Sequence, residues 1–334
     1  MTNIDFVVAW VDGSDPAWQQ KKAKALGAPE TDDRIQRYRD WDILRYWFRA
    51  AESFTPWVNN IFFICDQDPP KWLNQSHPKL KIIRHEDYIP QEYFPTFSSH
   101  TIELNIHRIQ GLSEQFVYFN DDMHIIRPLK PDFFFKKGLP RDSALLNPIP
   151  NTELRKQEGR IFTVPLNNTE YLNRDYIFRD CVKKHPMKWL TLRYGKSAFR
   201  NFFLMVWPRF VGFDELHLPQ AFLKASLEKA WEQDRDILDE TCHHPIRSDR
   251  DVNHWLVRYR QLAEGTFLPR KPIKNAVFQL EDQTTPWLDM IRKQEKPMIC
   301  LNDGPLTGGQ FEQVKQNLQE AFRSILPEKS AFEI

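Results

Sequence analysis

The chain has 334 residues, which is long enough for one elaborate domain or two modest ones. Its 46 lysines and arginines nearly balance 45 aspartates and glutamates, so the composition argues against bulk electrostatic binding of nucleic acid. Aromatic residues are frequent, at 13%, but only 11 glycines are present, and neither GxGxxG nor GxxxxGK(S/T) occurs. A glycine-rich dinucleotide or P-loop site is therefore not expected.

The cysteine pattern and the N-terminal residues bear on the location of the protein. Cys65, Cys181, Cys242 and Cys300 are far apart and form no CxxC pair, which is typical of reduced thiols in a cytoplasmic protein. Residues 1–5 carry no signal-peptide features, and no window of the chain approaches the roughly 20 apolar residues of a membrane span. We therefore expect a soluble, cytoplasmic protein with at most peripheral contact at the inner face of a membrane.

Strand and helix patterns alternate in the first part of the chain. Residues 4–10 predict a strand that ends in a turn at 12–16, and the charged stretch 21–33 predicts a mobile loop. Apolar spacing then predicts a helix, two strands, a second helix and a third strand, at 44–51, 61–65, 80–83, 99–109 and 115–119. This alternation predicts a mostly parallel α/β sheet.

The later part of the chain departs from this alternation. Residues 136–210 are irregular and rich in Asn, Arg and Pro, whereas helices are expected at 218–232 and 249–263. A strand at 298–301 and a helix at 311–325 follow.

These patterns predict one catalytic domain over residues 1–334. Its α/β core begins with residues 1–135. A largely helical insertion occupies 136–270, and the strand and helix of 271–334 complete the core.

The most informative motif is Asn120-Asp121-Asp122-Met123, which directly follows the apolar run 115–119. Two carboxylates at the carboxyl end of a strand lie where open α/β sheets bind their ligands. Two adjacent negative charges repel each other unless a cation neutralises them. Carboxylate oxygens are the ligands that Mg²⁺ or Mn²⁺ prefers, and such an ion could bridge the phosphates of a nucleotide. The alternative is an Asn-Asp turn without a metal, because both residues are favoured in turns.

The first predicted strand ends in a turn that combines an aromatic side chain, two carboxylates and a glycine: Trp10, Val11, Asp12, Gly13, Ser14 and Asp15. Its backbone amides and a carboxylate could contact the base and ribose of a nucleotide. An ordinary strand-to-turn signal explains the same residues, and for this segment alone we favour it.

A predicted helix start at 95–100 combines hydroxyl groups with titratable residues. Free backbone amides at a helix N-terminus bind anions, so a phosphate could lie beside Ser99, although simple N-capping explains the serine equally well. His100, Glu103 and His107 share one helix face at this spacing, which an exposed polar surface would also explain.

Three further positions carry groups suited to phosphate chemistry. His217 opens one predicted helix and could act as a general base, and Arg247, before the next helix, could neutralise a phosphoryl group. For an isolated His or Arg, a structural or surface role is the more common one. Asp303 follows an apolar run as Asp121 and Asp122 do, and it could add a ligand to the same ion.

Residues 193–213 interleave basic and aromatic side chains. A surface that meets a membrane or a lipid-linked acceptor has this composition. A core helix with basic flanks has it as well, and this second arrangement is the one that we expect.

Together these motifs resemble the Stealth family, the hexose-1-phosphate transferases of bacterial capsule and cell-wall polysaccharide synthesis. The animal relative of that family is the lysosomal-enzyme N-acetylglucosamine-1-phosphotransferase. Four regions carry the resemblance in the family's order: IDFVVAWVDGSD at 4–15; 37–128, with 44–46, 56–58, 95–100, 106–109 and 120–123; His217-Leu218-Pro219 with Arg247 and Asp251; and CLNDG at 300–304. Residues 136–210 carry no resemblance, and substrate choice could reside there.

The resemblance implies a GT-A-like, or Rossmann-like, α/β fold and the transfer of a sugar 1-phosphate from a UDP-sugar. The acceptor would be a hydroxyl of a growing glycan or a lipid-linked oligosaccharide. Attack at the β-phosphorus would form a phosphodiester and release UMP. In such a transfer the protein mainly positions the reactants and neutralises charge.

The resemblance also implies roles for individual residues. Asp121 and Asp122, with Asp303, would hold Mg²⁺ or Mn²⁺ across the diphosphate. His217 would take the acceptor proton, with His107 or Asp12 as alternatives. Phosphoryl charge would be neutralised by Arg247, with Arg45 or Arg108. The donor nucleotide would contact a set of residues at the strand ends: Trp10, Val11, Asp12, Gly13, Asp15, Arg45, Ser99 and Asn120.

Two rival functions fit parts of the pattern. A metal-dependent glycosyltransferase would attack the anomeric carbon and release UDP, and strand-terminal carboxylates suit it equally. A non-catalytic glycan-binding protein would be favoured by a degenerate metal site, yet every candidate acidic position is intact.

Overall fold

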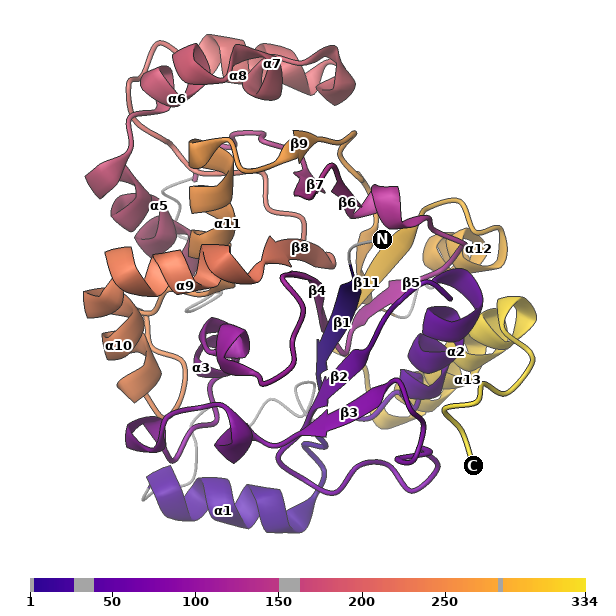
Figure 1. Cartoon of the computed structure of the whole chain (residues 1–334). Helices are drawn as coiled ribbons and strands as arrows, with labels where there is room; N and C mark the ends of the chain where they lie inside the picture. The colour runs from indigo at the N-terminus through magenta and orange to yellow at the C-terminus, as the bar shows by residue number, and fades with distance from the viewer. Residues whose placement is uncertain (1–2, 27–38, 150–162, 282–284) are drawn as a thin grey trace.

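A computed structural model describes residues 3–26, 39–149, 163–281 and 285–334. Its central sheet has five strands in the order β3-β2-β1-β4-β8 (Figure 1). The strands span Ile4–Ala9 (β1), Ile61–Ile64 (β2), Leu80–Ile83 (β3), Gln115–Asn120 (β4) and Gln220–Leu223 (β8). The first four strands are parallel and β8 is antiparallel to β4, which confirms the predicted α/β class and the mostly parallel sheet.

Helices cover both faces of this sheet, because successive side chains of a strand point to opposite faces. Phe6 and Val8 of β1 join the core on one face, and Val7 joins the core on the other. The first face is covered by α2 (Leu44–Phe54), α12 (Thr285–Arg292) and α13 (Gly308–Ile325). The second is covered by α3 (Ser99–Leu104), α9 (Lys224–Gln233), α10 (Arg235–His243) and α11 (His254–Glu264) (Figure 1).

A second sheet holds the end of the central one in place. It contains β10 (Val277–Leu280), β11 (Met298–Asp303) and β5 (Met123–Ile125), in the order β10-β11-β5. Only Asp121 and Asp122 separate β4 from β5, and β5 runs antiparallel to β11 with Met123 opposite Cys300. The two carboxylates are therefore anchored at the junction of the two sheets.

The range 136–270 contains a third hydrophobic core centred on Trp189. Four helices contribute to it, which are α5 (Thr163–Asp175), α6 (Phe178–Lys184), α7 (Pro186–Trp189) and α8 (Ser197–Leu204). A small sheet in the order β6-β7-β9 is formed by β6 (Phe135–Lys136), β7 (Leu139–Asp142) and β9 (Leu268–Pro269). Helices α6 to α8 form a layer at the upper edge of the molecule in Figure 1. Strand β8 also falls within this range, although it belongs to the central sheet.

Several predicted elements are wrong in detail. The helix expected at 249–263 begins only at His254, as α11, and the range 136–210, expected to be irregular, contains α5 to α8. The charged stretch from Lys21 begins inside a helix, α1 (Pro16–Leu26), and residues 27–33 lie outside the described part of the chain. The helix expected at 99–109 ends at Leu104 and continues as a 3-10 turn at Ile106–Arg108. The helix expected at 218–232 begins as strand β8, because residues 220–223 pair with β4.

The end of the chain is tied to α2. Arg49 donates two hydrogen bonds of 2.8 Å to the Glu333 carboxylate, and it also donates to the Leu326 carbonyl. Phe332 packs on Phe48, with ring centroids 5.4 Å apart. The N-terminal and C-terminal parts of the chain thus share one core. No helix among the described residues is long and apolar enough to cross a membrane.

Candidate active site

The pairing of β8 with β4 brings His217 to the acidic turn. Tyr118 lies opposite Gln220 in this antiparallel pair, and continuing the register past the strand ends places His217 beside Asp121. The backbone of Asp122 is fixed from the other side, where its carbonyl accepts a hydrogen bond from the Leu301 amide at 2.9 Å. Two strands distant in sequence therefore position the carboxylate and the imidazole.

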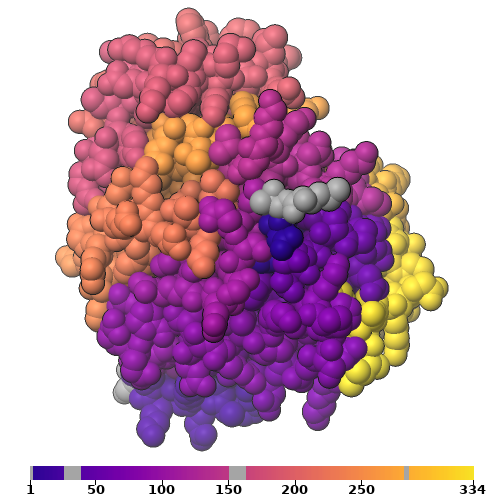
Figure 2. All heavy atoms as spheres, viewed as in Figure 1, coloured from indigo at the N-terminus to yellow at the C-terminus, as the bar shows by residue number. Residues whose placement is uncertain are grey.

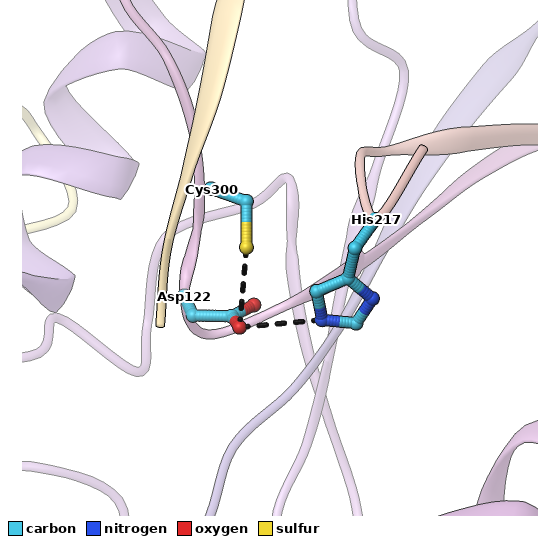
Figure 3. A group of neighbouring side chains, drawn as sticks. All are labelled: Asp122, His217 and Cys300. Atoms are coloured by element: carbon cyan, nitrogen blue, oxygen red, sulfur yellow. Dashed lines mark hydrogen bonds and ion pairs between the residues drawn. The ribbon is translucent and has the colours of Figure 1, made fainter. Parts of the chain in front are cut away.

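Asp122 is shared between two side chains (Figure 3). Its Oδ2 atom lies 3.3 Å from Nε2 of His217 and accepts a hydrogen bond from the Cys300 thiol, also at 3.3 Å. Its Oδ1 atom is buried without a hydrogen-bond partner among the described residues. Asp122 thus keeps one unused acceptor at the end of β4.

The electrostatics of the site favour a charged imidazole and a protonated thiol. Burial alone lowers the pKa of His217, but the hydrogen bond and the charge of Asp122 outweigh burial and raise it above the ordinary 6.5. Burial, together with the charge of Asp122, raises the pKa of Cys300 far above its usual range. Cys300 therefore donates its S–H to the carboxylate instead of ionising.

Asp121 behaves as one member of a crowded acidic pair. Desolvation by the surrounding chain and the neighbouring charge of Asp122 raise the pKa of Asp121 to about 7, although the residue itself remains exposed to solvent. The charge of Asp40 acts in the same direction. A cation beside the pair would relieve this repulsion.

Arg247 also acts on this site. Its Nη2 atom donates to the Ser99 hydroxyl at 2.6 Å, and its positive charge opposes protonation of His217. The loop that carries Arg247 is held by the fully buried Asp251, which accepts a hydrogen bond of 2.8 Å from the Ser248 amide.

The same aspartate joins this loop to α3. The Nδ1 atoms of His100 and His244 lie 2.9 and 2.7 Å from the two carboxylate oxygens of Asp251. Glu103, one turn further along α3, lies 2.6 Å from Nδ1 of His254. His100 and Glu103 therefore face a buried polar network and not the exposed surface that sequence alone allowed.

Residues 10–15, which are part of the set expected to contact the donor nucleotide, form a turn with internal hydrogen bonds, whereas Arg45 lies on α2 and Ser99 on α3. Trp10 stacks on Phe63, and Asp12 accepts hydrogen bonds from the amide and hydroxyl of Ser14. Gln67 closes the turn, since its side chain accepts from the Asp12 amide and donates to the Asp15 carboxylate.

This turn and the acidic turn lie at the same edge of the sheet. The neighbouring strands β1 and β4 place Ala9 opposite Asn120, so residues 10–15 continue from the strand end beside the acidic turn. Within that turn, Val11 is exposed and Gly13 is buried. The Asn120 side chain accepts a hydrogen bond from the Tyr118 hydroxyl.

Candidate metal ligands divide into two sets. Asp122, His217 and Cys300 each place one ligand atom within 4.8 Å of the other two, but sulfur ligands suit softer ions and this thiol stays protonated. Asp121 and Asp122 supply the oxygens that Mg²⁺ or Mn²⁺ prefers, and the unused Oδ1 of Asp122 fits that set. The expected third ligand, Asp303, forms a two-pronged ion pair with Arg39.

Three other candidates lie apart from the His217–Asp122 pair. The Arg108 guanidinium lies over the Trp231 ring, and the His107 ring also lies against Trp231. Burial lowers the pKa of His107 to about 3, so this imidazole is neutral at ordinary pH. Arg45 pairs with Asp42. Among the described residues, no hydrogen bond or ion pair joins Arg108, His107 or Arg45 to Asp122 or His217.

Sequence patterns missed the contacts of Cys300 and Arg39. Cys300 lies in an apolar run and begins the CLNDG region of the family resemblance, but neither feature indicates its contact with Asp122. Arg39 precedes the first predicted helix and is 264 residues from its partner Asp303. Cys300 and Asn302 are two residues apart in a strand, so their side chains share one face. This spacing could have indicated that the thiol points toward the polar end of β11.

Comparisons with known proteins identify the family. The model of Stealth protein CR1, conserved region 1, matches residues 2–29, and that of Stealth protein CR2, conserved region 2, matches residues 37–142. A solved glycosyltransferase, GlyE of Streptococcus pneumoniae TIGR4, is 12% identical with a TM-score of 0.26, covering 94% of this chain and 83% of its own. That score is too low to support an argument.

Similarity to curated proteins extends over the whole chain. A capsular polysaccharide phosphotransferase, WcwK of Streptococcus pneumoniae, is 35% identical over 100% of this chain and 98% of its own. The exopolysaccharide phosphotransferase cps2G of Lactiplantibacillus plantarum is 38% identical over 99% and 96%, respectively. The receptor polysaccharide phosphotransferase WefC of Streptococcus oralis is 36% identical over 100% of both chains. The chain therefore belongs to the Stealth family and is an enzyme, a phosphotransferase.

Proposed function

We propose that this enzyme transfers a hexose- or N-acetylhexosamine-1-phosphate from a UDP-sugar to a hydroxyl of a growing surface polysaccharide. Relatives named as capsular, exopolysaccharide and receptor polysaccharide phosphotransferases support this class of reaction. The observation that carries the proposal is the ion pair of His217 with Asp122 at a strand end where the charge of Arg247 also acts.

His217 is the proposed general base. Asp122 engages Nε2, and the other ring nitrogen points away from the carboxylate (Figure 3). That nitrogen would take the proton of the acceptor hydroxyl as the oxygen attacks the β-phosphorus. The carboxylate would stabilise the imidazolium that forms, as it does in other His–Asp pairs. The bond from the β-phosphorus to the bridging oxygen would break, and UMP would leave.

Arg247 is the proposed partner of the phosphoryl oxygens. Ser99 accepts a hydrogen bond from one of its guanidinium nitrogens, which limits the orientations of this planar group. The buried Asp251 holds the loop through the Ser248 amide. Fixed donors of this kind stabilise charge that develops in a transition state without reorganising.

Asp121 and Asp122 are the residues that would hold a divalent cation. Such an ion would neutralise charge on the diphosphate of the donor. The unpartnered Oδ1 of Asp122 and the raised pKa of Asp121 both fit a site that a cation completes. Asp303 would hold Arg39 in place through their ion pair, and it would bind the cation directly only if that ion pair opened.

The remaining parts of the chain receive roles in the same proposal. The turn at residues 10–15, with Asn120, would contact the UDP-sugar at the edge of the 1–135 core. The range 136–270 would face the glycan or lipid-linked acceptor, and 271–334 would complete the core. The four free, buried cysteines are typical of a reducing compartment, which supports a cytoplasmic reaction.

The nucleotide that is released tests the proposed reaction. Purified protein is incubated with Mg²⁺, a panel of UDP-sugars and a glycan extract as the source of acceptors, and the products are separated by chromatography. We expect UMP that depends on both the sugar donor and the acceptor. UDP in place of UMP would mean attack at the sugar carbon, and it would replace this proposal with a glycosyltransferase.

The Asp122→Ala variant tests the cation site. We expect activity to fall by about 100-fold or more and stimulation by Mg²⁺ to disappear, because the variant removes a charge placed for the transition state. The control is Asp132→Ala, which removes an exposed carboxylate from a turn outside the site. Equal metal stimulation in the Asp122 variant and the control would exclude Asp122 as a ligand.

A further inference from the structure

Helix α8 has its polar and apolar residues on unexpected faces. Asn201 is completely buried, whereas Phe199, Phe202 and Phe203 are 65%, 60% and 66% exposed. The buried amide explains this orientation. Asn201 donates to the carbonyls of Ala144 and Trp189 and accepts from the Leu146 amide, so the helix is anchored by hydrogen bonds and its phenylalanines face outward. The prediction that residues 193–213 form a core helix with basic flanks is therefore wrong for α8.

These phenylalanines belong to a larger exposed surface. Most of the large exposed apolar side chains of the described chain lie between residues 187 and 207. We call this surface the basic aromatic face. Its exposed apolar residues are Leu192, Phe199, Phe202, Phe203, Val206 and Trp207, and its exposed basic residues are Lys184, Arg193 and Lys196. Figure 2 shows this segment, in rose, as the outer layer at the upper edge of the molecule. Exposed apolar side chains gathered in one segment indicate an interaction site.

The charge around this face is one-sided. Residues 181–213 contain seven lysines and arginines and no aspartate or glutamate, whereas the rest of the chain has 39 basic and 45 acidic residues. Two of the seven, Lys183 and Arg200, pair with Asp180 and Asp214 just outside this range. Lys184, Arg193 and Lys196 are exposed, and none of them forms an ion pair within the described residues. A nearly neutral chain thus concentrates unneutralised positive charge where it also exposes aromatic rings.

We propose that the basic aromatic face docks on the surface of an anionic phospholipid bilayer. Aromatic rings enter the boundary between headgroups and acyl chains, while lysine and arginine contact anionic headgroups. A second copy of the chain fits poorly, because a two-fold interface would place the same cations of both copies together. This proposal does not depend on the reaction that the enzyme performs.

Vesicle flotation measures the docking directly. The full chain is mixed with vesicles of phosphatidylcholine alone or of phosphatidylcholine with phosphatidylglycerol, and the bound fraction is measured at low and high salt. We expect binding to the anionic vesicles only, with a loss as salt rises because exposed charges are screened. Absence of binding to anionic vesicles would overturn the proposal.

Two paired variants separate the apolar from the ionic contribution. Phe202→Ser with Phe203→Ser, and Lys184→Glu with Lys196→Glu, should each weaken vesicle binding by roughly tenfold or more. The matched controls are Leu166→Ser and Lys71→Glu with Lys130→Glu, which change exposed residues elsewhere. Equal losses in variants and controls would contradict a defined docking face. Normal circular dichroism would show that the variants fold.

A label reports the contact at a single residue. The four native cysteines are buried, so a cysteine introduced by Trp207→Cys can be labelled selectively with an environment-sensitive dye. Its emission should shift to the blue with anionic vesicles, and a label at Leu166→Cys should not shift. Sedimentation velocity covers the remaining alternative. Self-association that the Phe202 and Phe203 substitutions abolish, without vesicle binding, would make the face an interface between copies.

Discussion

The two carboxylate oxygens of Asp122 have different surroundings. One oxygen is shared by the His217 imidazole and the Cys300 thiol, and the other is buried without a partner. Because Cys300 remains protonated, it restrains the carboxylate without competing for its negative charge. The charge stays available to the imidazole and would also be available to the proposed cation.

The His217→Gln variant tests the proposed base. We expect kcat to fall by about 10² to 10⁴-fold, the usual contribution of a general base, with little change in stability. The control is His243→Gln, an exposed histidine at the end of α10. Activity within a few-fold of the original enzyme would remove His217 from this role.

The protonation of His217 can be measured without substrate. NMR titration of the metal-free protein should give a pKa above 6.5, and Asp122→Asn should lower it, since the carboxylate stabilises the charged ring. As a base, His217 must be neutral, so activity should increase as pH rises through this pKa. A pKa that is the same in both proteins would contradict the assigned pair.

The buried Glu103–His254 pair predicts how stability depends on pH. Burial alone would raise the pKa of Glu103, yet the charges of His254, His100 and Arg247 lower it to about 2. A carboxyl group with a depressed folded-state pKa stabilises the fold above its unfolded-state pKa, and this stabilisation is lost as pH falls through the folded-state value. The critical window therefore lies between pH values of about 4.5 and 2.

We expect Glu103→Gln to lower the free energy of unfolding by about 3 kcal/mol at pH 7. The difference from the original protein should shrink as pH falls through that window. Urea titrations at several pH values measure it, with Glu92→Gln, an exposed carboxylate, as the control. A difference that does not change with pH would show that packing and not charge is responsible.

Sequence predicted part of the site at the residue level. The strand-end pattern made Asp121 and Asp122 candidates, and the family resemblance gave His217 a role. The structure brings Asp122 and His217 within 3.3 Å of each other, and their roles stay predictions. The Arg39–Asp303 pair and the Cys300 contact were not predicted, because they join positions far apart in the chain. Spacing along a sequence carries no information about such partners.

At the scale of elements, β8 decides whether His217 reaches the site. Its four residues precede α9 directly, and the apolar spacing of 218–232 looks helical throughout. The pairing of β8 with β4 outweighs that local preference, since a short run follows its tertiary context. The sequence therefore made His217 a candidate but placed it at the start of a helix, whereas the structure places it before strand β8.

The hydrogen bonds of the buried Asn201 side chain should contribute to the stability of the protein and fix the position of α8. Asn201→Ala should destabilise the protein by about 2 to 3 kcal/mol, because it leaves a buried amide and two buried carbonyls without partners. Thermal unfolding measures the loss, and Asn317→Ala, which removes an exposed side-chain hydrogen bond on α13, is the control. A small effect in both variants would mean that hydrophobic packing alone fixes α8.

At the scale of the whole molecule, one hydrophobic core unites the two ends of the chain. Residues of β1, α2 and β2 pack with residues of α12, β11 and α13. The alternation of strands and helices predicted this parallel core, including β3 to the residue. It also predicted that the strand and helix of 271–334 complete the core, but it could not predict their side-chain partners, such as Arg49 with Glu333, because these contacts span more than 200 residues.

The Arg49–Glu333 ion pair joins α2 to the C-terminal segment, and its contribution to stability can be tested. Arg49→Ala should cost about 3 to 5 kcal/mol, since it leaves a buried carboxylate without its partner. Replacing both members with apolar residues, as in Arg49→Met with Glu333→Leu, should cost less. Chemical unfolding measures both, and Arg323→Ala, an exposed position on α13, is the control. A double variant as unstable as the single one would contradict an electrostatic origin.

The shared core also has a consequence for biosynthesis. While a ribosome is still translating the middle of the chain, α2 and β1 have no α13 or β11 to cover them, so a large apolar surface stays open. Folding of this core must wait until residues 285–334 have left the exit tunnel. A chain interrupted before that point would expose the surface that aggregation and quality control recognise. Premature termination should therefore yield a degraded fragment and not a partly active enzyme.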